Sequence, residues 1–440
     1  MKTPTDAVLR FIQQTTWDAL PTEVQHQSKR CLLDALGALI GGTAAPVSKL
    51  MTQVAHEQFG GDAATILVDG SRTSLIGAAL ANGFAANALD IDDGFRLVKG
   101  HPGTCILPVI LAAGERADPA GAEFLTAFVI GYETAIRAGL ILHSTHRTYH
   151  CSGSWGALGG AAAGGRLLGL DPDALRHAMG AAEYHAPFAP MMKGIAVPAM
   201  VKDAIGWGCM AAMSAVLMAE KGFTGVQPLF DDGPEPAWID SLGREYMFLN
   251  LYFKPYSACR WAQPAVEGVL KIQRENGLSP PDIAAIKIKT FTEAAALSRA
   301  YPANTEEAQY NMAFPIAAAL LDGEVGPAQT LPPRLFDADI RSLMDRIDVT
   351  PADRFNREFP ARALAEVVIE TADGRSIKSG VMSAKWDAAS GLPTDAEREA
   401  KFLWLVEPIL GEEKATKIAG MVWNFEKVDG LRGLIEICVK

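Results

Sequence analysis

The stretch Ala157-Leu-Gly-Gly-Ala-Ala-Ala-Gly-Gly-Arg-Leu-Leu168 combines helix-forming alanines with four glycines. Each glycine in a helix interior costs about 1 kcal/mol relative to alanine. A helix of this composition therefore needs burial against close neighbours, and its small side chains allow neighbouring helices to approach. The stretch predicts a closely packed helical core.

The sequence on either side of this stretch has the same helical character. From Asp6 to about Gln263, apolar residues recur at spacings of three and four, with interruptions at glycine pairs and at Pro102-Gly103. Residues 210–220 form a second apolar stretch that predicts another core helix. We therefore expect a mainly α protein with a large all-helical domain.

The pattern changes after Leu270. Residues 283–292 alternate in the manner of a half-buried strand, and residues 364–370 and 376–382 flank an Asp-Gly turn typical of a hairpin. Helical patterns return at 395–410 and 412–422. We predict a large all-helical domain formed by residues 1–266 and 404–440, and a smaller α+β domain formed by residues 267–403.

Composition limits the classes of function. The 440 residues carry a formal net charge of -11, which argues against a partner such as nucleic acid or an anionic membrane. The six cysteines include no C-x-x-C pair. The N-terminus lacks the apolar core of a signal peptide, and we expect no run close to the ~18 apolar residues of a membrane span. A soluble, cytoplasmic protein with a small-molecule substrate is predicted.

Three carboxylates and an imidazole gather in Asn87-Ala-Leu-Asp-Ile-Asp-Asp93 and the following His101-Pro-Gly103. Between apolar helices an isolated ionised carboxylate costs several kcal/mol, so each of these must be paired, metal-bound or solvated. One interpretation is a helix end, where aspartate and glycine are common. The other is a catalytic site.

Two further groups of residues suggest chemistry. His143, His146 and His150 would share a face if the segment were helical, which leaves zinc binding, a catalytic or substrate-binding role, and incidental surface use open. Lys202 precedes a buried helix, so its ammonium needs an anionic partner. This partner is either a nearby aspartate or a substrate carboxylate, and a desolvated lysine can also act as a general base.

Nucleotide-binding and hydrolase motifs are absent from the sequence: it has no G-x-G-x-x-G after a strand, no P-loop and no G-x-S-x-G. We therefore expect acid/base chemistry by His, Lys and Asp without a cofactor or a metal. An Asp-rich Mg²⁺-diphosphate site and a non-catalytic helical scaffold are the alternatives from other classes.

Four stretches carry a resemblance that spans most of the chain. They are Leu89–Asp93 with His101-Pro-Gly103, His150–Gly156 running into the Ala/Gly-rich helix and Leu168–Asp171, Lys202 with Lys221–Gly225, and Phe253–Tyr256 with Cys259-Arg260. In this order they resemble the motifs of the MmgE/PrpD family of 2-methylcitrate dehydratase, cis-aconitate decarboxylase and iminodisuccinate epimerase. Residues 309–323, 391–393 and 401–402 extend the resemblance.

The resemblance implies a homodimer with its active site in the cleft between a helical and an α+β domain. The family's catalytic residues carry over onto the motif positions Asp90 or Asp93, His101, His150 and Lys202. We expect Tyr149, Lys193, Lys254 and Arg260 to bind a small anionic di- or tricarboxylate.

Two positions depart from the family pattern. Phe314 stands where relatives usually have tyrosine, and Gln263 stands where Cys-Arg-x-x-His would supply histidine. Dehydration needs an acid for the leaving hydroxyl, whereas epimerisation needs only proton transfer on two faces of one carbon. We therefore expect an epimerase of the iminodisuccinate type, with a dehydratase of the 2-methylcitrate type, or a related decarboxylase, as the alternative.

Overall fold

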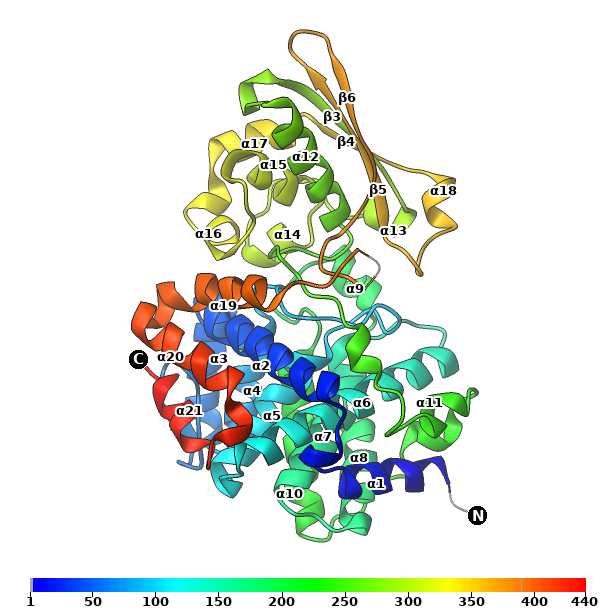
Figure 1. Cartoon of the computed structure of the whole chain (residues 1–440), viewed down its shortest axis with the longest axis vertical. Coiled ribbons are helices and arrows are strands. Elements are labelled where there is room, and N and C mark those ends of the chain that lie inside the picture. Colours follow the sequence, from blue (N-terminus) through cyan, green and yellow to red (C-terminus); the bar gives the residue numbers. More distant parts are fainter. Residues whose placement is uncertain (1–2, 389) are drawn as a thin grey trace.

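A computed structural model describes residues 3–388 and 390–440. Two parts are stacked along the longest axis of the molecule (Figure 1). The larger part is helical and contains both ends of the chain. The smaller part, from α12 to β6, combines a sheet with helices. The predicted fold class is confirmed.

The elements of the larger part come from both ends of the sequence. Its α-helices are α1 (Pro4–Gln14), α2 (Thr22–Gly42), α3 (Pro46–Phe59), α4 (Leu75–Asn87), α5 (Pro102–Ala117), α6 (Gly121–Thr145), α7 (Ser152–Leu167), α8 (Pro172–His185), α9 (Met191–Ala196), α10 (Ile205–Glu220), α11 (Ala237–Asp240), α19 (Asp395–Leu410), α20 (Glu412–Trp423) and α21 (Arg432–Ile437). A two-residue antiparallel pair, β1 (Ala64–Thr65) and β2 (Arg72–Thr73), lies among them and was not predicted.

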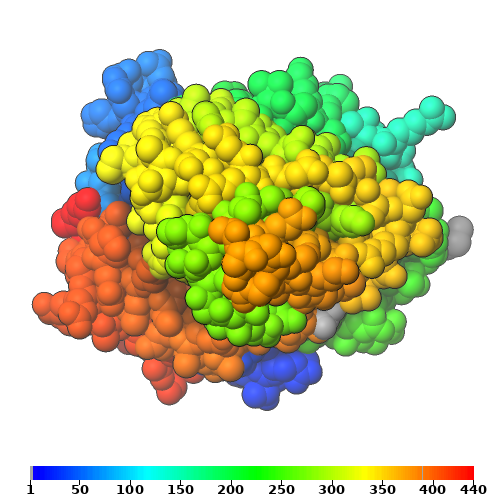
Figure 2. Space-filling view, turned by 90° about the horizontal axis from the view of Figure 1, so that it is seen from above, coloured from blue at the N-terminus to red at the C-terminus, as the bar shows by residue number. Residues whose placement is uncertain are grey.

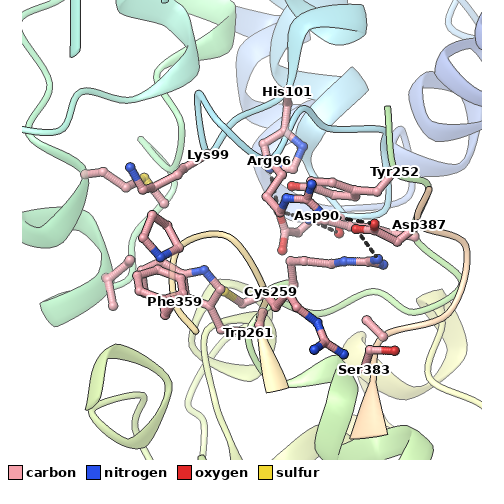
Figure 3. Close-up of a pocket in the computed structure, with 18 of the residues that line it drawn as sticks. Asp90, Arg96, Lys99, His101, Tyr252, Cys259, Trp261, Phe359, Ser383 and Asp387 are labelled. Carbon is pink, nitrogen blue, oxygen red and sulfur yellow. Dashed lines mark hydrogen bonds and ion pairs between the residues drawn. The ribbon is translucent and has the colours of Figure 1, made fainter. Parts of the chain in front are cut away.

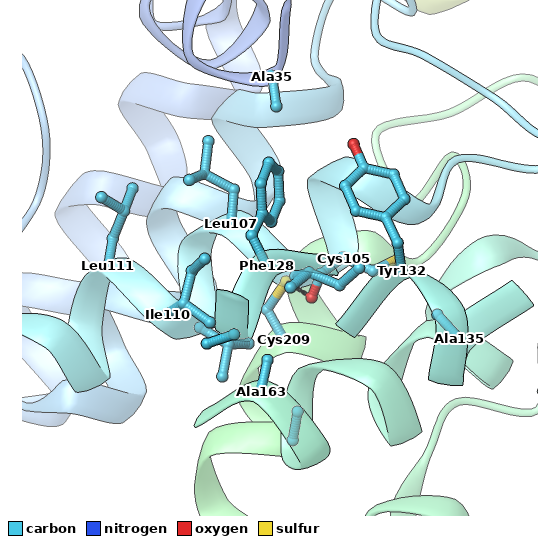
Figure 4. Close-up of a cluster of buried hydrophobic side chains, with 14 of the residues drawn as sticks. Ala35, Cys105, Leu107, Ile110, Leu111, Phe128, Tyr132, Ala135, Ala163 and Cys209 are labelled. Carbon is cyan, nitrogen blue, oxygen red and sulfur yellow. Dashed lines mark hydrogen bonds between the residues drawn. The ribbon is translucent and has the colours of Figure 1, made fainter. Parts of the chain in front are cut away.

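The Ala/Gly-rich helix α7 lies at the centre of this part and packs against α5, α6, α8 and α10. A Cβ atom on Gly156 would lie 2.4 Å from Cys105 Sγ of α5, and one on Gly159 would lie 2.5 Å from the Gly131 carbonyl oxygen of α6. Both positions therefore need glycine for the helices to approach this closely. Figure 4 shows side chains of α5, α6, α7 and α10 meeting in the hydrophobic core. The predicted packing is confirmed.

Helix α6 corrects the expectation that no run approaches the length of an apolar membrane span. Its 25 residues include an 18-residue window with a mean hydropathy of 1.4, which is long and apolar enough for a membrane span. However, 94% of that window is buried inside the protein. The helix is therefore a core element of a globular chain, and its apolar character reflects burial on all sides.

The smaller part is built on a four-stranded sheet of order β4-β3-β5-β6. Its elements are α12 (Gln263–Asn276), β3 (Ile283–Thr290), α13 (Thr292–Ala295), α14 (Thr305–Gln309), α15 (Ala313–Asp322), α16 (Pro327–Thr330), α17 (Ala338–Met344), β4 (Ile347–Pro351), α18 (Asp353–Asn356), β5 (Leu364–Thr371) and β6 (Ser376–Ser383). Strand β5 pairs antiparallel with β3 and β6, which confirms the predicted strand and hairpin. Strand β4, parallel to β3, was missed.

The chain crosses between the two parts twice. Helix α12 packs on the sheet and on α15, and the expected boundary after residue 266 falls inside it. After the hairpin, α19 returns to pack on α2, where Lys401 Nζ lies 2.5 Å from Asp34 Oδ1. Figure 2 shows from above that the smaller part covers the middle of the helical part, whose blue and red margins extend beyond it. The domain limits themselves stay predictions.

Candidate active site

A cleft lies where the helical part meets the α+β part (Figure 3). Its lining comes from the loop between α4 and α5, from α9, from residues 252–261 and from two loops of the smaller part, residues 359–363 and 383–387 with Ser390. Charged, aromatic and apolar side chains therefore converge from distant parts of the sequence. Such a concave site with a few convergent polar groups is typical of a small-molecule site.

The three aspartates of the α4–α5 loop point in different directions. Asp92 accepts hydrogen bonds from Asn87 Nδ2 at 3.0 Å and from Thr104 Oγ1 at 2.7 Å, so it fixes the loop. Asp93 accepts from Tyr132 Oη at 2.5 Å inside the helical core. Only Asp90, whose φ is +50°, lines the cleft.

Asp93 lies behind the cleft wall and does not line it. Burial and the neighbouring Asp34 carboxylate raise the pKa of Asp93 to about 8, against the opposing hydrogen bond from Tyr132. A carboxyl in this position acts on loop structure and stability. Of the two aspartates expected for catalysis, the structure brings Asp90 to the cleft and leaves Asp93 in the core.

His101 is buried and precedes α5. Its Nδ1 lies 2.7 Å from the backbone oxygen of Asp93, which can only accept, so we assign the ring proton to Nδ1. Its other ring nitrogen, Nε2, lies 3.6 Å from Asp90 Oδ1. The ring is thereby held with Nε2 next to the carboxylate of the cleft.

Asp90 and Lys254 form a buried ion pair. The distance between Lys254 Nζ and Asp90 Oδ1 is 2.8 Å, and Nζ also donates to the Asp90 backbone oxygen at 2.9 Å. Burial raises the pKa of Asp90, but the charges of Lys254, Lys202 and His101 outweigh that effect and hold it below its ordinary value. Asp90 is therefore an anion at neutral pH.

A third carboxyl completes the cluster. Asp203 is buried, lines the cleft and accepts a hydrogen bond from Tyr310 Oη at 2.8 Å. Ligand atoms of Asp90, His101 and Asp203 lie within 4.8 Å of one another. Because the Lys254 ammonium already neutralises Asp90, we interpret this group as an acid/base cluster. It is the one group of metal-like spacing within residues 3–388 and 390–440, and it excludes His143, His146 and His150.

Besides Asp93, three of the expected site residues lie outside the cleft lining. Lys202 Nζ donates to the Asn87 backbone oxygen at 2.5 Å and to Gln309 Oε1 at 2.6 Å, and burial lowers its pKa. His150 is buried beside Phe188, and burial lowers its pKa as well. Lys193 lies on α9 with its side chain exposed.

The other expected binding residues do line the cleft. Tyr149 Oη donates to the Lys99 backbone oxygen, and Lys99 Nζ lies 5.0 Å from the Tyr149 ring centroid. Arg260 lies over the Tyr252 ring, with its guanidinium carbon 4.5 Å from the centroid. Arg260 Nη2 also lies 3.3 Å from Asp387 Oδ2.

Comparisons with known proteins agree with this architecture. Residues 7–244 match the MmgE/PrpD N-terminal domain, and residues 256–427 match the MmgE/PrpD C-terminal domain.

The chain belongs to the MmgE/PrpD family.

Individual relatives cover most of the chain. Cis-aconitate decarboxylase of Aspergillus terreus (strain NIH 2624 / FGSC A1156) is 22% identical, over 98% of this chain and 95% of its own length. The cis-aconitate decarboxylase-like protein oryM of Aspergillus oryzae is 24% identical over 92% and 91%. Human cis-aconitate decarboxylase is 26% identical over 79% and 77%. These MmgE/PrpD relatives bear the names of lyases.

The two departures from the family pattern do not line the cleft. Phe314 is fully buried in the core of the smaller part. Gln263 is also fully buried, and its Oε1 accepts from Arg260 Nη1 at 3.1 Å while its Nε2 donates to the Ala258 backbone oxygen at 3.0 Å. Gln263 therefore orients Arg260, and neither substitution removes a protic group from the cleft wall.

Several cleft residues were missed by sequence reasoning. They are Arg96, Lys99, Asp203, Tyr252, Tyr310 and Asp387. Asp203 had one available signal, its position next to a lysine already expected to need an anionic partner. Tyr252 had none, because a tyrosine between apolar residues is as common in a core as in a site. Tyr310 lies in residues 309–323, which carry part of the family resemblance, but nothing in that stretch singled out its side chain.

Proposed function

We propose that this protein is a lyase that releases CO₂ from a small tricarboxylate of the cis-aconitate type, with its own side chains as acids and bases. The single observation that carries the proposal is the combination of an acid/base cluster, Asp90–His101–Asp203, with cationic groups in the same cleft. The names of the MmgE/PrpD relatives support the same reaction class.

Cations in the cleft suit a multiply charged substrate. Lys99 is half-buried, and no carboxylate of residues 3–388 and 390–440 lies within 4.0 Å of its ammonium. Arg260 presents a planar guanidinium that can bind a carboxylate through two hydrogen bonds. These two groups would each hold one substrate carboxylate, because charge pairing in a site of low dielectric is stronger than in water.

The reaction makes one demand beyond binding. Loss of CO₂ from the methylene carboxylate of cis-aconitate leaves an electron pair, which shifts across the double bond. A proton must then reach the far alkene carbon, which gives a methylidene dicarboxylate. The Asp90–His101–Asp203 cluster supplies proton-transfer groups, and cations on the remaining carboxylates would stabilise the developing charge.

Epimerisation was expected from the sequence because two protic side chains were missing. However, Phe314 and Gln263 lie outside the cleft lining, whereas Tyr149, Tyr252 and Tyr310, which carry hydroxyls, line it. The lyase is therefore the better proposal. Epimerisation of an iminodicarboxylate and dehydration of a 2-hydroxy tricarboxylate are the other outcomes of the test below.

Assembly and location belong to the same proposal. We propose a cytoplasmic homodimer without nucleic-acid or membrane partners. Six unpaired, buried cysteines suit a reducing compartment. Large exposed apolar side chains on α8–α10 suit a surface covered by a second copy: Tyr184, Phe188, Val197, Val201 and Trp207.

The test is incubation with cis-aconitate, 2-methylcitrate and iminodisuccinate in turn, followed by NMR. CO₂ with a methylidene product from cis-aconitate is the expected result. Formation of 2-methylaconitate without CO₂ would replace the proposal with a dehydratase. Change at the α-carbon of iminodisuccinate, without CO₂ release from cis-aconitate, would replace it with an epimerase.

A further inference from the structure

Asp203 occupies an unusual turn immediately before α10. Its two neighbours, Lys202 and Ala204, have φ values of +35° and +56°, in the left-handed region that non-glycine residues rarely adopt. The turn directs the Lys202 ammonium to the Asn87 and Gln309 oxygens, whereas Asp203 becomes part of the cleft lining. A strained turn that separates two adjacent charged side chains in this way is characteristic of a functional position.

The Asp203 carboxyl is only partly satisfied. The residue is 1% exposed, and its Oδ2 accepts the hydrogen bond from Tyr310. Its Oδ1 has no hydrogen-bond partner, and no basic nitrogen within the described chain lies within 4.0 Å of either oxygen. An ionised carboxylate in this position would be costly. A neutral carboxylic acid with its proton on Oδ1 costs less, because only a neutral hydroxyl is then left without a partner.

The pairing within the cluster leads to the same state. Asp90 and Asp203 each offer an oxygen within 4.8 Å of a ring nitrogen of His101, but the Lys254 ammonium pairs with Asp90. The Lys202 ammonium also acts on both carboxyls, yet it donates to the Asn87 and Gln309 oxygens and lies more than 4.0 Å from the Asp203 oxygens. Two buried carboxyls this close do not both ionise readily, so one of them keeps a proton. The ion pair fixes Asp90 as the anion. Asp203 is then the protonated partner.

We propose that Asp203 is the proton donor of the lyase reaction, acting through Oδ1 on the alkene carbon that becomes basic when CO₂ leaves. In this step the Asp203 O–H bond breaks and a substrate C–H bond forms, which leaves the Asp203 carboxylate. Solvent returns the proton before the next turnover. The proposal rests on the proposed function and assigns its acid to a residue that sequence reasoning did not select.

The surroundings of Asp203 support this assignment. Burial raises the pKa of Asp203, and the Asp90 charge adds to the rise, while His101, Lys202 and the Tyr310 hydrogen bond oppose it. The titratable groups around this carboxyl are Asp90, His101, Cys105, Tyr149, Cys151, Lys202, Cys259 and Tyr310. Activity that depends on the acid form falls as pH rises through the Asp203 pKa.

Asp203→Asn tests the proposal because the amide fills the same space and still accepts from Tyr310, but it cannot protonate carbon. We expect kcat to fall by about 10²–10⁴-fold with KM little changed, and the alkaline fall of the pH profile to disappear from the residual activity. The control is Glu183→Gln, since burial raises the pKa of Glu183 to about 7 outside the cleft lining. It should keep wild-type kinetics.

Infrared spectra of the substrate-free proteins make the test independent of folding defects in the variant. Asp93 also contributes a protonated carboxyl at neutral pH, because its pKa is raised to about 8, so the spectra are compared as differences. We expect the spectrum of the wild type minus that of Asp203→Asn to show a protonated-carboxyl band at neutral pH, and Glu183→Gln to retain the band of Asp203. Absence of that band, or near-wild-type kcat in Asp203→Asn, would overturn the proposal. If the wild type releases no CO₂ but exchanges substrate protons with D₂O, the proposed function is wrong, and exchange by the same variants decides the role of Asp203.

Discussion

Lys254→Met removes the cation that balances the Asp90 carboxylate. The two side chains are 1% and 2% exposed, their charged atoms are 2.8 Å apart, and Lys254 also donates to the Asp90 backbone. Removal of one partner from such a buried pair costs about 3–5 kcal/mol, because the other charge stays buried without compensation. We expect a loss of this size in the free energy of unfolding near neutral pH.

The loss should depend on pH with a definite sign. In the wild type the pKa of Asp90 is below its ordinary value, so its stabilising contribution is present above about pH 4 and is lost as pH falls. Without Lys254, burial prevails and the pKa of Asp90 rises. The variant is then most stable at acidic pH and loses stability as pH rises through the new pKa.

Urea unfolding at two pH values, one near neutrality and one near 5, measures both effects. The double variant Lys254→Met/Asp90→Asn should recover part of the loss, since the unpaired charge is gone. Lys287→Met is the matched control, because its pair with Glu370 is exposed and is worth about 1 kcal/mol at most. A loss in Lys254→Met as small as in this control, or equal at both pH values, would refute the reasoning.

Three further predictions concern the cleft and the core behind it. Burial and Asp34 raise the pKa of Asp93 to about 8, so the stabilising contribution of Asp93, present at acidic pH, is lost as pH rises through that value. Asp93→Asn should therefore reduce the loss of thermal stability with rising pH. A slope equal to that of the wild type would contradict the burial argument. Arg260→Met should raise KM by about 10- to 100-fold, the equivalent of a charged hydrogen bond of about 1.5–3 kcal/mol. The KM of the wild type should also rise with ionic strength, because salt screens charge pairing. A KM that does not depend on salt counts against carboxylate binding by Lys99 and Arg260. Activity should survive exhaustive EDTA treatment, whereas loss restored by Mg²⁺ or Zn²⁺ would place a cation at Asp90, His101 and Asp203.

Local patterns were sufficient for most of the fold. The glycine-rich stretch predicted a buried helix because only close packing compensates for its composition, and Gly156 and Gly159 lie at such contacts. The Asp373-Gly374 turn predicted the hairpin from its backbone preference. Strand β4 was missed because five residues that end at Pro351 give too short an alternation. The membrane-length apolar window of α6 was overlooked.

The site was predictable where its residues are close in sequence or share a motif, as for Asp90, His101 and Lys254. The sequence did not predict which of the neighbouring residues Lys202 and Asp203 lines the cleft. This difference depends on left-handed backbone angles at two non-glycine residues, which no sequence signal specifies. Phe314 shows the same limit, because its place in a core and outside the cleft is set by tertiary packing.

The central claim is that this protein releases CO₂ from a tricarboxylate with proton delivery by its own side chains. The most direct measurement is NMR of cis-aconitate incubated in D₂O with metal-free protein. The account predicts a methylidene dicarboxylate with one deuterium at the methylene carbon beside the retained carboxylate, formed together with CO₂. Unchanged cis-aconitate, under conditions in which iminodisuccinate exchanges its α-proton for deuterium, would contradict it.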